Sequence, residues 1–187
     1  MRAKGLIAAG GEATRLGELT RVVNKHLLPV GDWPMIFYPL QLLQLAGVEE
    51  VMIVTGQGHA GQVIDLLGNG RMSQRGSTDP LFDLDLTYKV QVEAGGIAQV
   101  VGMAESFAGN DDLVVCLGDN IFEYAEAAAI RSFVDGDDGA AVFVKDVPDP
   151  ERFGVVVYGE GERVVDVVEK AGVVDMRYEA PPSSDAV

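Results

Sequence analysis

The sequence predicts a three-layer α/β protein in which a mostly parallel sheet is covered by helices on both faces, with a β-hairpin near the C-terminus. Short β-branched and aliphatic runs alternate with segments whose apolar residues recur at helical spacing. That order is typical of parallel strands joined by right-handed crossovers. Further along, two valine-rich runs flank the turn at 159–162, which is the pattern of a hairpin.

Each element is predicted from its own pattern. Five strands ahead of the hairpin are expected from short apolar runs, at 5–9, 51–55, 86–92, 113–119 and 140–147. Four helices are expected from helical spacing, good helix formers and glycine stops, at 34–47, 60–68, 96–109 and 123–134. The hairpin strands are expected at 153–158 and 163–170, an exposed loop at 71–83, and a loop or tail at 171–187. We therefore expect one folded domain over 1–170.

The composition is that of a folded protein and excludes several classes. Of the 187 residues, 48% are hydrophobic and 23% charged, close to the globular average and unlike a disordered chain. A single cysteine excludes a disulfide framework. No apolar stretch approaches the ~18 residues that a membrane span needs. We expect a cytoplasmic protein that does not enter a membrane.

The charge is acidic overall but basic at the N-terminus. The formal net charge is −15, which disfavours binding to nucleic acid or to anionic lipid. Residues 1–25 hold five basic and two acidic side chains, whereas the rest of the chain holds 9 basic and 27 acidic ones. This asymmetry indicates a site for a small anion such as phosphate, and an ordinary charge fluctuation on a solvated surface is the alternative.

Glycines stand at the exits of three predicted strands, and ligands of open parallel sheets bind beyond such carboxyl ends. The segments are 10–11, 56–61 and 118–120. The second reads G-x-G-x-x-G between a strand and a helix, with Asp83 and Asp85 further on, which is the dinucleotide-binding pattern. An NAD-dependent oxidoreductase is therefore an alternative hypothesis. The pattern normally follows the first strand of a domain, which this segment does not.

The end of the first predicted strand suits a triphosphate. Gly10 and Gly11 let the backbone approach phosphate oxygens, and N–H groups of the turn can bind them. Arg15 adds a planar guanidinium and Lys25 a mobile point charge. No G-x-x-x-x-G-K-[ST] occurs, so this is not a Walker A loop. A simple tight turn is the structural alternative.

Several ordered motifs resemble those of the sugar-1-phosphate nucleotidylyltransferases. They are GGEATRL, KHLLPV, PMIFYPL, LGDNIF, DPERFGVV and EK. The similarity runs from Lys4 to about Lys170 and is greatest to the thymidylyltransferases that act on glucose 1-phosphate. It implies the Rossmann-like fold of nucleotide-diphospho-sugar transferases. It also implies Mg²⁺ and transfer of a nucleotidyl group from a nucleoside triphosphate, dTTP, to a sugar 1-phosphate, glucose 1-phosphate, with release of pyrophosphate.

The same resemblance implies roles for individual residues. It makes catalytic residues of Arg15, Lys25, Asp119 and Lys170. It places against the nucleotide Gly10, Gly11, Ala13, Thr14, Arg15, Gln91, Gly96, Ile97 and Asp119. It places against the sugar phosphate Asn120, Gly154, Glu169 and Lys170. Gln91 would read the base through its amide, and Asp119 would bind Mg²⁺, with a turn cap as the alternative role for that carboxylate.

The chain departs from the family pattern in places. Ala13 stands where the family loop has a third glycine, and Ala171 follows Lys170 where the family has proline. Family members continue with a further strand, helices and a second metal-binding aspartate, so we expect a C-terminally shortened catalytic domain. A weak or inactive nucleotide- or sugar-phosphate-binding domain is therefore the alternative function. Unpaired strand edges lead us to expect a homo-oligomer.

The remaining reactive side chains are predicted to be structural. Cys116 lies in an apolar run typical of a buried strand, where a thiol acts as a small hydrophobe. His26 and His59 have no cysteine or histidine partners at the spacing of a zinc site.

Overall fold

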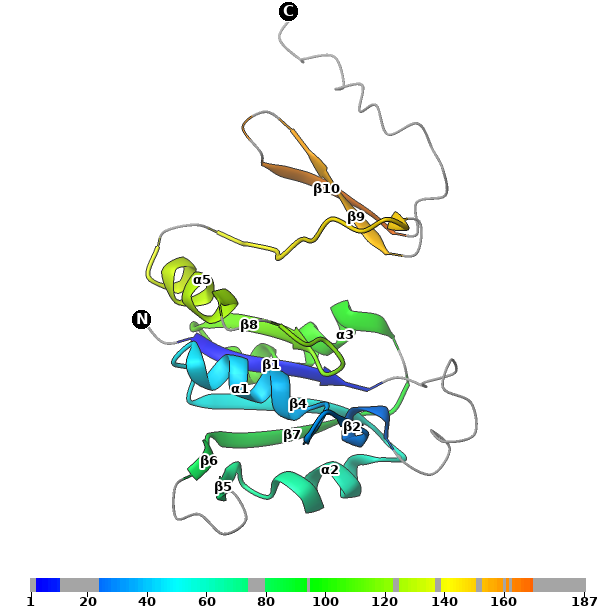
Figure 1. Ribbon diagram of the computed structural model, residues 1–187, viewed down its shortest axis with the longest axis vertical. Helices are drawn as coiled ribbons and strands as arrows, with labels where there is room; N and C mark the ends of the chain where they lie inside the picture. The colour runs from blue at the N-terminus through cyan, green and yellow to red at the C-terminus, as the bar shows by residue number, and fades with distance from the viewer. Residues whose placement is uncertain are drawn as a thin grey trace, which may run out of the picture. The chain divides into compact units, whose positions relative to one another are not determined.

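The computed structural model describes residues 3–10, 24–73, 80–93, 95–122, 125–136, 139–150, 153–159, 161 and 163–169 (Figure 1). Contacts divide the chain into two compact units, Met1–Gly139 and Ala140–Val187. Among the helices of these described ranges, none is long and apolar enough to cross a membrane.

The first unit is built on a four-stranded parallel sheet in the order β7-β4-β1-β8 (Figure 1). Its strands are β1 (Ala3–Ala9), β4 (Glu50–Gly56), β7 (Asp85–Gln91) and β8 (Asp112–Leu117). The register aligns Ala9 with Thr55 and Gly56 with Gln91. The carboxyl ends of β1, β4 and β7 therefore meet along one edge of the sheet, where ligands of such sheets bind.

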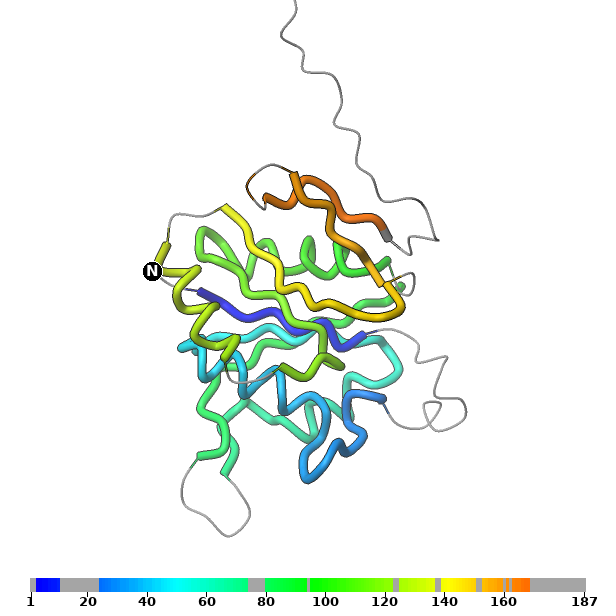
Figure 2. Tube along the Cα trace, turned by 45° about the horizontal axis from the view of Figure 1, so that its top comes forward, coloured from blue at the N-terminus to red at the C-terminus, as the bar shows by residue number. Residues whose placement is uncertain are grey.

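Helices cover both faces of this sheet (Figures 1 and 2). They are α1 (Phe37–Leu45), α2 (Ala60–Leu67), α3 (Gly96–Met103), α4 (Glu105–Ala108) and α5 (Ala125–Val134). Ile7 of β1 packs in a cluster with residues of α1, α2 and α5, whereas its neighbour Leu6 packs in a second cluster with Val100 of α3. Because successive strand residues face opposite sides, the alternation at Leu6 and Ile7 builds the predicted three layers.

The central strands follow from their composition. β4 is buried along Val51–Thr55, and such a continuous apolar run is typical of a parallel strand covered on both faces. Gly5 in β1 allows α1 to approach, because a Cβ there would lie 2.8 Å from Cδ1 of Leu43. The strand predictions at 5–9, 51–55, 86–92 and 113–119 are confirmed as β1, β4, β7 and β8, with small shifts at their ends.

Short elements extend the first unit. They are η2 (Lys25–Leu27), β2 (Pro29–Val30), β3 (Trp33–Pro34), β5 (Arg71–Ser73) and β6 (Pro80–Asp83). The prediction of a loop over 71–83 is wrong at both ends, because β5 and β6 pair antiparallel there. Phe82 explains this pairing, since its ring is buried against that of Phe37 at a centroid distance of 5.1 Å. The two helices predicted at 34–47 and 96–109 are shorter: α1 begins at Phe37, and α3 gives way to α4 at Ala104.

The second unit confirms the hairpin and corrects one strand. β9 (Gly154–Tyr158) and β10 (Val164–Glu169) pair antiparallel, with Gly154 opposite Glu169. The predicted strand at 140–147 is wrong, because these residues belong to none of the sheets and Val142, Phe143 and Val144 are exposed. Apolar alternation predicts a strand only where a neighbouring strand provides the hydrogen bonds of a sheet, and 140–147 is part of no sheet within the described ranges.

Candidate active site

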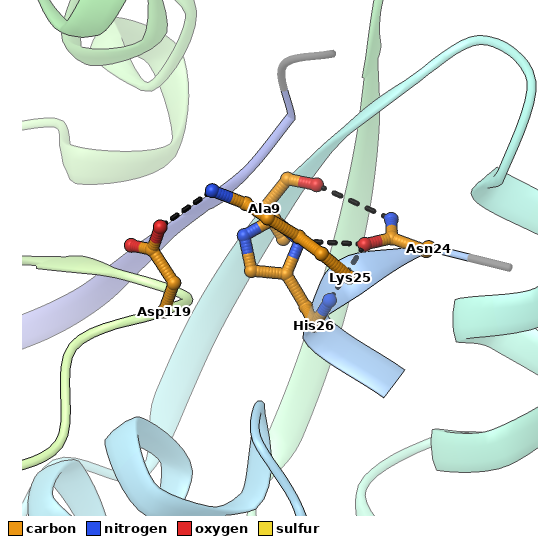
Figure 3. Close-up of polar contacts among 5 residues, drawn as sticks. All are labelled: Ala9, Asn24, Lys25, His26 and Asp119. Atoms are coloured by element: carbon orange, nitrogen blue, oxygen red, sulfur yellow. Dashed lines mark hydrogen bonds and ion pairs between the residues drawn. The ribbon is translucent and has the colours of Figure 1, made fainter. Parts of the chain in front are cut away.

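Lys25 and Asp119 meet beyond the carboxyl end of the sheet (Figure 3). Lys25 begins η2, and Asp119 follows the end of β8 by two residues. Nζ of Lys25 donates to Oδ2 of Asp119 at 2.5 Å. The two side chains are 24% and 36% exposed, respectively, so the ion pair lies within reach of a ligand.

Asp119 is held in its ionised form. Partial burial by itself raises the pKa of this carboxyl, but the hydrogen bond and charge of Lys25 outweigh burial, and the pKa stays below its ordinary value. The site therefore presents a carboxylate and an ammonium side by side at neutral pH. A carboxylate oxygen is a ligand that Mg²⁺ prefers, and an ammonium is a partner for phosphate.

Asn24 ties the turn that carries Lys25 to the end of β1 (Figure 3). Its Oδ1 accepts from the backbone N–H of His26 at 2.9 Å and lies 2.6 Å from Nδ1 of that ring. Its Nδ2 donates to the carbonyl oxygen of Ala9 at 3.4 Å. Because an amide oxygen only accepts, Nδ1 of His26 carries a proton. This buried network places Lys25 next to the strand that leads into Gly10.

His26 connects the turn to the segment that carries Asp119. Its side chain is 1% exposed, and a Cβ on Gly118 would lie 2.8 Å from its Cδ2. Burial, followed by the charge of Lys25, lowers the pKa of His26 to about 4, so the ring is neutral at pH 7. The structural role predicted for His26 is confirmed, because the ring packs between the segments that carry Lys25 and Asp119.

Gln91 lies at the same edge of the sheet, on the strand that is two positions away from β1. It ends β7 and is 7% exposed, and its Oε1 would lie 2.9 Å from a Cβ on Gly10. Its Nε2 donates to Oε1 of Gln99 at 2.5 Å, and Gly95 N–H donates to the same oxygen at 2.9 Å. The structure thus brings Gln91 and Gly10 together at this edge. Gln99 carries no motif of its own, and only its hydrogen bonds reveal it.

The other predicted residues fall into three groups. Gly96 opens α3 at φ +80°, exposed Ile97 follows it, and exposed Asn120 follows Asp119. In the second unit, Gly154 and Glu169 are cross-strand partners. The residues outside the described ranges are Gly11, Ala13, Thr14, Arg15 and Lys170.

The dinucleotide pattern at 56–61 lacks the geometry that its glycines would serve. A Cβ on Gly56, Gly58 or Gly61 would meet nothing within 4 Å, so no close packing of helix on strand requires these glycines. Asp85 begins β7 and therefore lies at the opposite edge of the sheet from Gly56, which ends β4. The structure therefore disfavours the NAD-dependent alternative.

Cys116 is structural, as predicted. It is buried in the apolar cluster that β8 shares with α1, and burial raises the pKa of its thiol to about 11. Because the thiolate is the reactive form, this side chain is unsuited to nucleophilic attack at neutral pH.

Known proteins are similar to this chain in both sequence and fold. Residues 4–175 match the profile of the Nucleotidyl transferase family. A glucose-1-phosphate thymidylyltransferase of Neisseria meningitidis serogroup A, serotype 4A, is 41% identical over 169 residues, which cover 89% of this chain and 55% of the relative. A Bacillus anthracis protein, provisionally named a glucose-1-phosphate thymidylyltransferase and crystallised with sucrose, is 43% identical with a TM-score of 0.80 and covers 90% of this chain and 65% of its own.

A more distant structure shares the fold. UTP-bound UGPase from Acinetobacter baumannii is 21% identical with a TM-score of 0.73, and the match covers 92% of this chain and 69% of that one. This chain spans about half the length of the curated relatives it matches. The family profile matches from residue 4 to residue 175, through the motifs that carry Lys25 and Asp119, and the chain therefore belongs to the nucleotidyl transferase family.

Proposed function

We propose that this chain transfers a nucleotidyl group from dTTP to glucose 1-phosphate. An oxygen of the sugar phosphate attacks the α-phosphorus, and the bond from that phosphorus to the β-phosphate oxygen breaks. The products are a nucleotide sugar and pyrophosphate. Support for the two substrates comes from relatives named glucose-1-phosphate thymidylyltransferase at 37–41% identity.

The pairing of Lys25 with Asp119 carries the proposal. In-line transfer between phosphates requires alignment and charge neutralisation rather than a side-chain nucleophile. Nζ of Lys25 lies 2.5 Å from Oδ2 of the ionised Asp119, beyond the carboxyl end of a parallel sheet. The two side chains therefore supply opposite charges at the place where such folds bind nucleotides. In this role Lys25 contacts phosphate oxygens and Arg15 contacts the departing pyrophosphate.

Mg²⁺ fits the donor at this site. Asp119 is ionised and accessible, and Mg²⁺ typically binds through one or two carboxylates while it keeps several waters and contacts substrate phosphates. Within the described ranges, no three His, Cys, Asp or Glu side chains gather to form a cage of protein ligands, which suits that mode of binding. Asp119 would hold the ion, and the ion would offset phosphate charge.

The remaining assignments extend the site toward each substrate. The glycine-rich segment with Gly10, Gly11, Ala13 and Thr14 would contact the nucleotide, and Gln91 would bind the base above the surface formed by Gly96 and Ile97. For the sugar phosphate we propose Asn120, Gly154, Glu169 and Lys170. A homo-oligomeric state stays a prediction. The cytoplasm is the proposed compartment, because a chain with a single cysteine forms no internal disulfide.

The test titrates the 187-residue chain with dTTP and Mg²⁺ by calorimetry, then adds glucose 1-phosphate and measures pyrophosphate. We expect saturable dTTP binding, no NAD⁺ binding, and pyrophosphate release that depends on the sugar phosphate. Lys25→Met should weaken dTTP binding, because it keeps the length of the side chain and removes the charge. A parent chain that binds no nucleoside triphosphate would contradict the proposal. Binding without pyrophosphate release would favour a binding domain.

A further inference from the structure

One side-chain oxygen of Gln99 accepts two hydrogen bonds, one from the backbone of Gly95 and one from the amide of Gln91, and we call this arrangement the relay. The N–H of Gly95 donates to Oε1 of Gln99 at 2.9 Å, and Nε2 of Gln91 donates to the same oxygen at 2.5 Å. Gln99 lies on α3, and Gln91 ends β7. The relay therefore links the helix that follows the sheet edge to the last residue of an edge strand.

This relay fixes which way both amides face. A backbone N–H can only donate, so the atom of Gln99 that faces Gly95 is its oxygen. That oxygen in turn requires a donor from Gln91, which turns Nε2 of Gln91 toward it. If the Gln91 amide rotated by half a turn, two acceptor oxygens would face each other at hydrogen-bond distance. The alternative orientation of Gln91 is thereby penalised.

The other polar atom of the Gln91 amide, its oxygen, faces away from Gln99 and is a hydrogen-bond acceptor. Its Oε1 lies beside Gly10, where the lack of a side chain makes room: a Cβ there would be 2.9 Å away. Among the residues that the structure describes, none donates a hydrogen bond to this oxygen. One N–H of Nε2 also remains beyond the bond to Gln99, because an amide nitrogen carries two. Gln91 thus presents an acceptor and a donor in one set order.

We propose that Gln99 is a positioning residue that makes the site prefer thymine or uracil over cytosine. The inference rests on the proposed function, in which Gln91 binds the base. Thymine and uracil offer an N3–H donor beside the O4 acceptor, whereas cytosine offers the N3 acceptor beside the N4 amino donor. An amide that is free to rotate pairs with either edge. An amide held in one orientation matches only one of them.

The test compares dTTP and dCTP affinities by calorimetry in the presence of Mg²⁺, for the parent chain and three variants. Gln99→Met keeps the approximate length and removes the acceptor, so the ratio of dTTP to dCTP affinity should fall about tenfold, equivalent to about 1.4 kcal/mol. Gln99→Glu keeps an acceptor oxygen for both donors and should restore the parent ratio. Any effect of its added charge falls on both triphosphates alike and cancels in the ratio.

Gln44→Met is the matched control. Gln44 also uses its amide to bridge two backbone groups, accepting from Asp83 N–H at 2.8 Å and donating to the carbonyl oxygen of Leu81 at 3.3 Å. These contacts lie at β6, outside the site, so this variant should keep the parent ratio. It reports what the loss of such a glutamine does to the fold alone.

The outcomes separate this inference from the proposed function. A parent chain that binds neither triphosphate contradicts the proposed function. If the parent prefers dTTP and Gln99→Met keeps the same ratio, or loses both affinities equally, the positioning role of Gln99 is wrong and the proposed function stands. Should Gln99→Met fail to fold by circular dichroism, Gln99→Ala is held to the same criterion, because it also removes the acceptor.

Discussion

At the scale of single residues, the site consists of an ion pair between two charged side chains and a buried, neutral histidine ring that packs beside it. Lys25 and Asp119 make the contact that a ligand would meet, and buried His26 packs against the segments that carry them. The family resemblance predicts site roles for Lys25, Asp119 and Gln91, and the structure places all three at the carboxyl end of the sheet. Asn24 and Gln99 were not predicted, because their roles depend on contacts with Ala9 and Gly95 that exist only in the folded chain.

Asp119→Asn tests the metal-binding role. The substitution keeps the shape and removes the charge, so Mg²⁺ should no longer strengthen dTTP binding in calorimetric titrations. Stability should change little, because partly exposed ion pairs contribute only about 0.2–1 kcal/mol. If Asp119 were merely a turn cap, the melting temperature would fall while the effect of Mg²⁺ on binding persisted.

The lowered pKa of His26 predicts how the free energy of unfolding depends on pH. Its folded pKa of about 4 lies below the ordinary 6.5, so the unfolded chain binds the proton more readily. Stability is therefore greatest above pH 6.5 and falls as the pH is lowered toward 4, by up to about 3 kcal/mol. Urea unfolding at pH 7 and pH 4.5 measures this loss. His26→Gln, which does not titrate, should lose less stability over the same interval, and equal losses in both proteins would contradict the assignment.

The pH interval separates His26 from Asp119. The pKa of Asp119 is lowered in the folded chain, so its contribution is present above the ordinary value of 3.8 and is lost only as the pH falls through the lower folded pKa. Measurements at pH 4.5 and above therefore report mainly on the histidine.

At the scale of elements, prediction succeeded where a segment's own pattern determines its environment. The apolar runs of β1 and β4 correspond to interior strands of a parallel sheet, and that of β8 corresponds to an edge strand. The predictions were wrong for segments whose secondary structure depends on tertiary contacts. The pairing of β5 with β6 accompanies the burial of Phe82 against Phe37. Residues 140–147 have the alternation of a strand but belong to no sheet in the part of the chain that the structure describes.

Gly118→Ala tests the packing of the turn between β8 and Asp119. The new methyl would lie 2.8 Å from Cδ2 of His26 and 3.3 Å from the carbonyl oxygen of Ala8, so the ring or the strand end must shift. We expect a loss of about 1–3 kcal/mol in unfolding free energy, with weaker dTTP binding because Lys25 and Asp119 move with the ring.

Gly58→Ala is the matched control for this substitution. A Cβ on Gly58 would meet nothing within 4 Å. Its unfolding free energy and dTTP affinity should stay close to those of the parent, as measured by urea titration and calorimetry. Equal destabilisation in both variants would show that the contact between Gly118 and His26 has no special importance.

At the scale of the whole molecule, the sheet brings distant parts of the chain to one edge. Gly10 follows β1, Gln91 ends β7 and Asp119 follows β8, and the parallel order places these strand ends on the same side. The alternation of strands and helices was enough to predict that architecture, because right-handed crossovers allow few arrangements. The order of the strands and the individual contacts required the structure. The family match at residues 4–175 begins in the first compact unit and ends within the second.

We propose that this edge of the sheet supports transfer of a nucleotidyl group. The most direct measurement incubates the chain with dTTP labelled with ³²P at the α-phosphate, glucose 1-phosphate and Mg²⁺, and separates the products by chromatography. We expect the label to appear in a nucleotide sugar while pyrophosphate is released unlabelled, and we expect Lys25→Met to slow this transfer. Label that remains in dTTP, or that is released as dTMP whether or not glucose 1-phosphate is present, would contradict it.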